Sequence, residues 1–164
     1  MSYILVNAVV EPEIGNPVVY YSIVIVISIL IGAMMIFFSV IKKAKKARKE
    51  ELDARFQNKK ILFYSKNANF LGYKSKNYKQ VTGSGYLVLT EEELYFLMWL
   101  PPHEIKIEIT KITKIEFPEL FLGKNSKKIV KINYINNEKQ SDEIAWSIPK
   151  LDKIKSELKK LNLL

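Results

Sequence analysis

The sequence contains no cysteine, a single histidine and only six glycines in 164 residues. The lack of cysteine excludes a disulfide framework and thiolate chemistry, and it agrees with a reducing compartment. The one histidine, His103, lies in a Pro-Pro-His-Glu segment that predicts a solvated turn. Without a second histidine at ligand spacing, neither a metal site nor a histidine-based triad can be assembled locally. We therefore expect no bound metal.

The few glycines form no recognised phosphate-binding or nucleophile motif. TGSG at 82–85 lacks the spacing of a dinucleotide fingerprint, the Gly-Lys-Thr of a phosphate loop and the nucleophile elbow pattern. The consecutive carboxylates Glu91, Glu92 and Glu93 are expected to repel one another in a solvated turn. Because no nucleophile, base and orienting group can be named together, the sequence predicts a protein without enzymatic activity and without a cofactor.

Charge is absent from the 24 residues between Val18 and Ile41. As a helix this run reaches about 36 Å, enough to cross a hydrocarbon core of about 30 Å with some tilt. Tyr20 and Tyr21 lie at its start, where amphipathic rings favour the headgroup level. The sequence therefore predicts a single transmembrane helix over 18–41.

Lysine and arginine dominate the residues directly after this run. These juxtamembrane basic residues are Lys42, Lys43, Lys45, Lys46, Arg48 and Lys49. Basic residues next to a membrane segment are retained on the cytoplasmic side, so we expect a single-pass protein of the cell membrane with residues 1–17 outside and the remainder in the cytoplasm. A cleaved signal peptide would carry its basic residues before the apolar run. The basic run serves as a topology determinant and linker, and an electrostatic contact with anionic lipid is compatible with that role.

The helical pattern continues beyond the apolar run. Lys46 with Glu50 and Glu51 with Arg55 have the i,i+4 spacing of stabilising helical ion pairs. We therefore expect a basic helical linker over 42–58 before the cytoplasmic domain begins.

Residues 59–164 show short apolar segments separated by turn residues, which predicts an antiparallel β domain. The expected strands are KKILFYS (59–65), GYLVLT (85–90), LYFLMW (94–99), EIKIEI (104–109), ITKIEF (112–117), KKIVKINYI (127–135) and SDEIAWSI (141–148). EIKIEI alternates strictly, as in a sheet with one wet face. We expect the hydrophobic interior of this domain to include Leu87, Leu89, Leu94, Phe96 and Met98.

The carboxyl-terminal segment PKLDKIKSELKKL predicts an amphipathic helix. Its apolar stripe consists of Leu151, Ile154, Leu158 and Leu161, and Pro149 suits the first turn. Such a stripe needs a partner surface, which the open end of a small barrel provides. About seven strands with a closing helix are the outline of a pleckstrin-homology-like (PH-like) domain.

Several motifs add a resemblance to this outline. VTGSGYLVLTEEELYF, followed by IKIEITKITKIEF and the terminal helix, resembles the GRAM and related bacterial PH-like domains. The matching positions are Gly85, Leu87, Leu89, Thr90, Leu94, Phe96, Ile107, Ile112 and Ile115. The chain also looks like uncharacterised membrane-anchored proteins with an ANF-LG stretch, an FLGK loop and an Ala-Trp pair, here at Ala68 to Phe70, Phe121 to Lys124, and Ala145 with Trp146. The resemblance implies binding of lipid headgroups or proteins rather than catalysis.

A basic segment is the first candidate binding surface. The connection SKNANFLGYKSKNYKQ carries Lys66, Lys74, Lys76 and Lys79, with aromatic residues between them. The resemblance makes this loop, 66–79, the leading candidate for anionic headgroups, because the first inter-strand loop of PH domains commonly holds them. Aromatics between lysines also suit single-stranded nucleic acid, but a membrane tether favours lipid, so we expect no nucleic acid partner. An ordinary solvated loop is the remaining interpretation.

Two apolar turns, 97–102 and 117–124, are the second candidate. Their large side chains either fold back on the core or form a patch for a protein partner or a second copy of the chain. The residues of this possible partner patch are Trp99, Leu100, Phe117 and Phe121. Ser28 and Gly32 also form one small-xxx-small pair that would allow helix contact in lipid, so a homo-oligomer is compatible with the sequence.

The sequence as a whole predicts a membrane-tethered binding or scaffolding module. Contact with anionic lipid through the loop 66–79 is the favoured mode. A protein-interaction adaptor, or a subunit of a homo-oligomer that uses the apolar turns, is the alternative.

Overall fold

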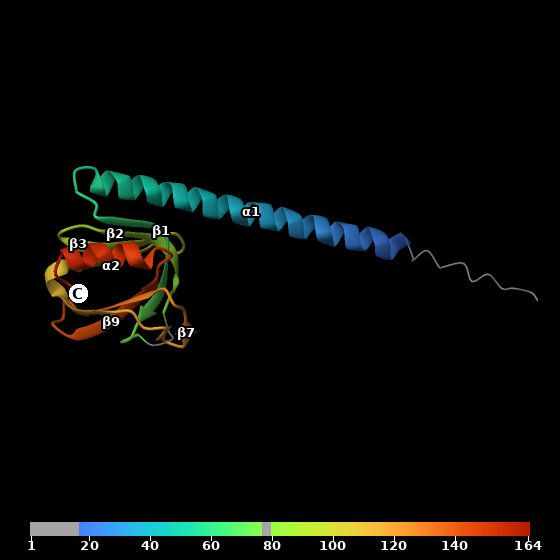
Figure 1. Cartoon of the computed structure of the whole chain (residues 1–164). Helices are drawn as coiled ribbons and strands as arrows, with labels where there is room; N and C mark the ends of the chain where they lie inside the picture. The colour runs from blue at the N-terminus through green and yellow to red at the C-terminus, as the bar shows by residue number, and fades with distance from the viewer. Residues whose placement is uncertain (1–16, 77–79) are drawn as a thin grey trace, which may run out of the picture. The chain divides into compact units, whose positions relative to one another are not determined.

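The structure is a computed structural model that describes residues 17–76 and 80–164. It begins with one continuous helix, α1 (Pro17–Phe56), which includes the apolar run and the basic run together (Figure 1). The chain divides into two compact units, Met1–Val40 and Ile41–Leu164. The last 16 residues of α1 thus belong to the same unit as the sheet, whereas the sequence predicted a linker over 42–58 outside the domain.

The first half of α1 is long and apolar enough to cross a membrane by its length and composition. The basic half is stabilised by ion pairs along the helix. Lys46 lies 3.9 Å from Glu50, as expected, and Lys49 pairs with Asp53. Glu51 pairs with Arg48 at 2.6 Å rather than with Arg55.

The remaining chain folds mainly into antiparallel strands and one further helix. The elements are β1 (Phe63–Tyr73), β2 (Gly83–Leu89), β3 (Glu93–Met98), β4 (His103–Glu108), the 3-10 turn η1 (Ile109–Lys111), β5 (Ile112–Glu116), β6 (Leu120–Phe121), β7 (Lys124–Asn125), β8 (Ile129–Ile135), β9 (Ser141–Ser147) and α2 (Leu151–Lys160). Seven strands form one sheet in the order β4-β3-β2-β1-β9-β8-β5, and β6 pairs with β7. The expected seven strands and terminal helix are therefore present.

Strand β1 differs most from its predicted position at 59–65. Its first half pairs with β2 and its second half with β9, and register shifts occur at Ser65/Ala68 and at Phe70/Gly72. These bulges bend the strand and carry it through polar residues that the hydrophobic pattern assigned to a loop. At its end the side chain of Gln80 bonds both backbone groups of Tyr73, at 2.6 and 2.9 Å, much as a neighbouring strand would.

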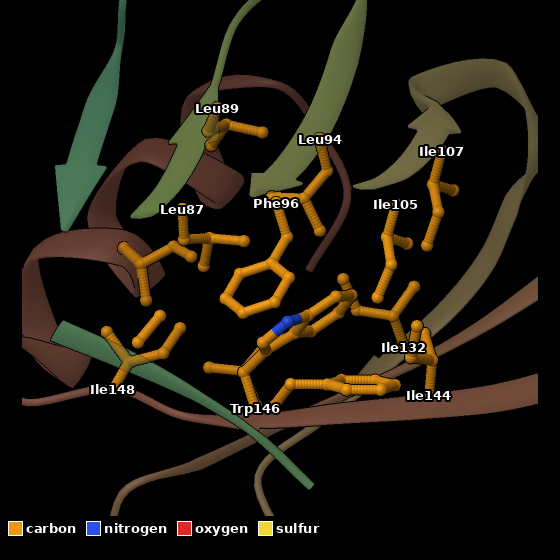
Figure 2. Packing of buried hydrophobic residues seen from close by; sticks show 14 of the residues in the cluster. Leu87, Leu89, Leu94, Phe96, Ile105, Ile107, Ile132, Ile144, Trp146 and Ile148 are labelled. Atoms are coloured by element: carbon orange, nitrogen blue, oxygen red, sulfur yellow. The ribbon is translucent and has the colours of Figure 1, made fainter. Parts of the chain in front are cut away.

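One face of the sheet encloses the main hydrophobic core (Figure 2). The expected core residues of β2 and β3 all lie there, and Figure 2 shows Leu87 and Phe96 directed toward Trp146 of β9. Ile154 and Leu158 of α2 are fully buried in the same cluster, so the predicted apolar stripe does pack on the strands.

The opposite face of β2 and β3 is also apolar, and the end of α1 covers it. Leu52 and Phe56 are buried in one cluster with Tyr86, Val88, Tyr95 and Leu97. The rings of Phe56 and Tyr95 meet edge to face at 5.4 Å. Both faces of these strands are buried, so their sequences are unbroken apolar runs. In β4, by contrast, buried and exposed residues alternate, as expected for a strand with one wet face.

Truncating Phe56 tests whether this helix end is part of the domain. The Phe56→Ala variant should lower the free energy of unfolding by about 3 kcal/mol, because a buried aromatic side chain is removed from a packed cluster. Urea unfolding of the full chain in detergent micelles, followed by tryptophan fluorescence, measures this change. The neighbouring exposed-site variant Gln57→Ala should change it by less than about 0.5 kcal/mol. Equal effects of the two variants would mean that 42–56 is a linker after all.

Candidate functional site

The lysines of the predicted loop 66–79 do not lie together. Lys66 is in the first bulge of β1, whereas Lys74 and Lys76 follow the end of that strand. Eight residues of extended chain correspond to roughly 26 Å, shortened here by the bend. Lys79 lies outside the described residues. The predicted loop 66–79 is therefore not one loop: Lys66 lies within β1, and the connection from β1 to β2 begins at Lys74.

The loop after β1 is held at its base by β9. The carboxylate of Asp142 accepts hydrogen bonds from the backbone N–H and the hydroxyl of Ser75, at 3.1 and 2.7 Å. Lys74 pairs with Glu143, which also accepts a bond from Lys131. Lys76 has its ammonium 4.6 Å from the ring centre of Tyr73. Among the described residues, Lys76 has no acidic partner and remains available to an anion.

The sequence analysis predicted that His103 is a solvated turn residue, and this prediction is wrong. It begins β4 half-buried, with its ring 6.1 Å from that of Phe70 and 6.5 Å from that of Tyr73. Burial, together with the charge of Lys76, lowers the pKa of His103 below its ordinary value. The imidazole is therefore neutral at pH 7 and packs as an aromatic group.

Trp99 connects the β3–β4 turn to the basic half of α1. The Lys45 ammonium lies 3.8 Å from the centre of the Trp99 ring, and the Tyr86 hydroxyl donates to the Lys45 carbonyl at 3.1 Å. The backbone N–H of Trp99 donates a hydrogen bond to the backbone carbonyl of Ser84, so the start of β2 lies next to this turn. Lys42 and Lys43 are exposed, and the other juxtamembrane basic residues take part in helix pairs or in this contact.

The apolar turns are mostly packed, not exposed. Phe121 is buried on Leu71 and Ile129, and half-buried Phe117 packs on the core with the Lys155 ammonium 4.6 Å from its ring centre. Leu100 is 43% exposed and Leu120 is 60% exposed. Trp99, Leu100, Phe117 and Phe121 therefore do not form one exposed patch. The reason is that β6 and β7 fold back on the sheet, which hydrophobicity alone did not predict.

Glu93 is a charged site that the sequence analysis misjudged. Instead of being solvated in a turn, it starts β3 and is only 2% exposed. Three cations surround its carboxylate: Lys59 at 3.3 Å, Lys106 at 3.3 Å and Arg55 at 3.5 Å. Burial alone would raise the pKa of Glu93, but hydrogen bonds and charge from Lys59 and Lys106 outweigh it and hold the pKa below its ordinary value. The nine basic and three acidic residues of 42–60 were a signal that this segment needed carboxylate partners.

The neighbouring acidic residues complete this connection between α1 and the sheet. Glu91 pairs with Lys60 and Glu92 with Lys59, at 2.9 and 2.8 Å. Thr90 shapes the turn by accepting bonds from the N–H groups of Glu92 and Glu93. The three carboxylates are thus matched to basic residues that follow the helix.

The described residues bring no catalytic constellation together. They contain no group of three or more histidine, aspartate or glutamate side chains that could hold a metal ion. Glu104 is exposed and pairs with Arg55 at 2.9 Å, while Asp142 is engaged by Ser75.

Comparisons with known proteins bear on the fold alone. No protein-family model matches the chain, and no curated protein matches it. Among solved structures it is similar to the crystal structure of the C-terminal domain of an unknown protein from Leishmania infantum, with 16% sequence identity and a TM-score of 0.53. The match covers 73% of this chain and 98% of that chain. The fold of this chain is therefore similar to that of another protein, which is itself described as unknown.

Replacing Glu93 tests the buried carboxylate. Because its pKa is depressed in the folded state, its contribution is complete above the ordinary carboxyl pKa of about 4.3 and is lost as the pH falls below that value. At pH 7 the Glu93→Gln variant should lower the free energy of unfolding by roughly 1–3 kcal/mol. At pH 3 the difference from the unmodified protein should shrink.

The matched control for this variant is Glu91→Gln. It removes an exposed ion pair in the same turn and should cost less than about 1 kcal/mol at either pH. Denaturant unfolding at both pH values measures the two variants. A loss for Glu93→Gln that does not depend on pH would contradict the electrostatic explanation.

Proposed function

We propose that this protein is a non-enzymatic, single-pass membrane protein whose β-rich domain is PH-like and contacts anionic lipid headgroups. The four-strand meander β1 to β4, the strands β5, β8 and β9, and the core-packed α2 support the PH-like assignment. The length and apolar composition of α1, with six basic residues directly after the apolar run, support a span with the domain in the cytoplasm.

The observation that carries this proposal is the contact of Lys45 with Trp99 and Tyr86. Lys45 is four residues after Ile41, a rise of about 6 Å along a helix. Because only three residues separate Lys45 from Ile41, we infer that the end of the domain that bears Trp99 is tethered close to the membrane. The start of β2 lies at this same end, since the carbonyl oxygen of Leu100 would be 3.5 Å from a Cβ added at Gly83.

The side chains at this end suit a lipid surface. Leu100 and Val81 are apolar and exposed, at 43% and 53%. Lys76 and the exposed Lys42 and Lys43 add positive charge to the proposed contact, each worth about 1 kcal/mol near an anionic leaflet. In this arrangement Leu100 and Val81 insert among the headgroups, and the lysine ammonium groups contact the phosphates.

The orientation can be tested because the chain has no native cysteine. A membrane-impermeant maleimide applied to intact cells should label the variant Ser2→Cys and spare Ser156→Cys. After permeabilisation both should react, which controls for reagent access. Labelling of Ser156→Cys in intact cells would reverse the proposed topology.

Lipid contact can be tested with a nitroxide on the Leu100→Cys variant of the full chain in nanodiscs. In discs with anionic lipid, the label should be more accessible to oxygen than to a water-soluble nickel complex. Lys74→Glu with Lys76→Glu should weaken this difference, as should high salt, because the attraction is electrostatic. A label at Ser156→Cys provides the aqueous reference. Identical accessibility at both positions in neutral and anionic discs would refute the lipid contact.

A further inference from the structure

A second candidate site lies between β1 and α2. A cleft of about 340 Å³ opens between the first bulge of β1 and the start of α2. Its lining residues are Tyr64, Ser65, Lys66, Asn67, Pro149 and Lys150. None of them is acidic, although the domain contains many carboxylates.

Ser65 is the most informative residue of this cleft. It is only 6% exposed, yet its hydroxyl has no hydrogen-bond partner among the described residues. The hydroxyl oxygen itself is not enclosed by protein, so it is open to a ligand in the cleft. Ser65 ends the regular pairing with Leu87 and directly precedes the bulge, so its place in the cleft is set by the β1–β2 register.

Two lysines provide the charge. Lys66 lies in the bulge and Lys150 lies at the N-cap position of α2, and both are exposed. Neither has an acidic partner within the described part of the chain, unlike Lys59, Lys60 and Lys74. Both line the cleft, Lys66 from the β1 bulge and Lys150 from the start of α2.

The start of α2 adds backbone donors. Lys150 forms no side-chain cap, and the first amide of the helix to find a helical acceptor is that of Ile154, bonded to the Lys150 carbonyl at 3.4 Å. The amides of residues 151–153 have no helical acceptor, as at any helix start. Asp152, the one acidic residue of the first turn, lines a different cleft with Phe117. The helix start is thus left without a side-chain anion on the Ser65 side.

We propose that this cleft binds a phosphate monoester through Lys66, Lys150, the Ser65 hydroxyl and the first amides of α2. Hydroxyl, ammonium and amide groups are all donors, which suits an acceptor-only dianion. The same chemistry is offered by free phosphate compounds and by a lipid with a phosphate monoester headgroup. Tyr64 of the cleft packs in one cluster with Tyr86 and Trp99. None of the groups proposed here to bind the ligand is used in the proposed lipid contact, so neither proposal depends on the other.

The test follows backbone amide signals of the full chain in zwitterionic micelles by NMR. Sodium phosphate at pH 7.5 should cause saturable shifts at residues 65–67 and 151–153, which sodium chloride at the same ionic strength does not cause. In a second arm, lysophosphatidic acid is added to the micelles, with lysophosphatidylcholine as its control. Saturation by phosphate assigns the site to free phosphate compounds, and saturation by lysophosphatidic acid alone assigns it to a lipid headgroup.

The variant Lys66→Gln with Lys150→Gln should weaken the apparent affinity at least about tenfold, since two charged donors are lost. Ser65→Ala should weaken it less. The matched control Lys139→Gln with Lys159→Gln removes the same charge at exposed positions elsewhere and should leave the titration unchanged. Unaltered signals in the rest of the spectrum show that each variant is folded. Absence of saturable shifts in both arms, equal shifts with chloride, or undiminished binding by the Lys66/Lys150 variant would overturn the proposal.

Discussion

The packing of Leu52 and Phe56 on the outer face of β2 and β3 is the contact on which the rest of this structure depends. Each such side chain contributes about 1.5–3 kcal/mol when removed from water. The contact covers a second apolar face that would otherwise be exposed beside the core. It also makes the residues after Ile41 part of the domain, so that the basic run is held at fixed positions on the sheet surface.

Charge pairing reinforces this contact and limits which basic residues are free to bind a ligand. Arg55 and Lys59, at and just beyond the end of α1, converge on Glu93, and its two neighbouring glutamates take Lys59 and Lys60. A net charge of +9 therefore overstates the positive surface available to a partner. Lys66, Lys76 and Lys150, which the two proposed sites use, have no acidic partner among the described residues, and the same is true of Lys127 and Lys128 elsewhere on the surface.

The bulges of β1 determine how these two sites are separated. A regular strand would have alternated its side chains and paired with one neighbour over its length. The register shifts at Ser65/Ala68 and Phe70/Gly72 let β1 pair with both β2 and β9, so the sheet curves round its core (Figure 1). Lys66 thereby comes next to the start of α2, while Lys74 and Lys76 follow the far end of the strand.

The sequence alone determined the elements whose signal is local: the long apolar helix, the seven strands, the terminal amphipathic helix and the inner core around Leu87 and Phe96. Periodicity and length suffice for these because each depends on the residues of one segment. Tertiary structure decided what depends on contacts between segments. Only the fold could show that Phe56 covers a sheet, that Glu93 is buried among cations and that Lys66 and Lys150 line one cleft. The hydrophobic pattern of a segment shows how apolar each of its faces is, but it does not show which element covers that face.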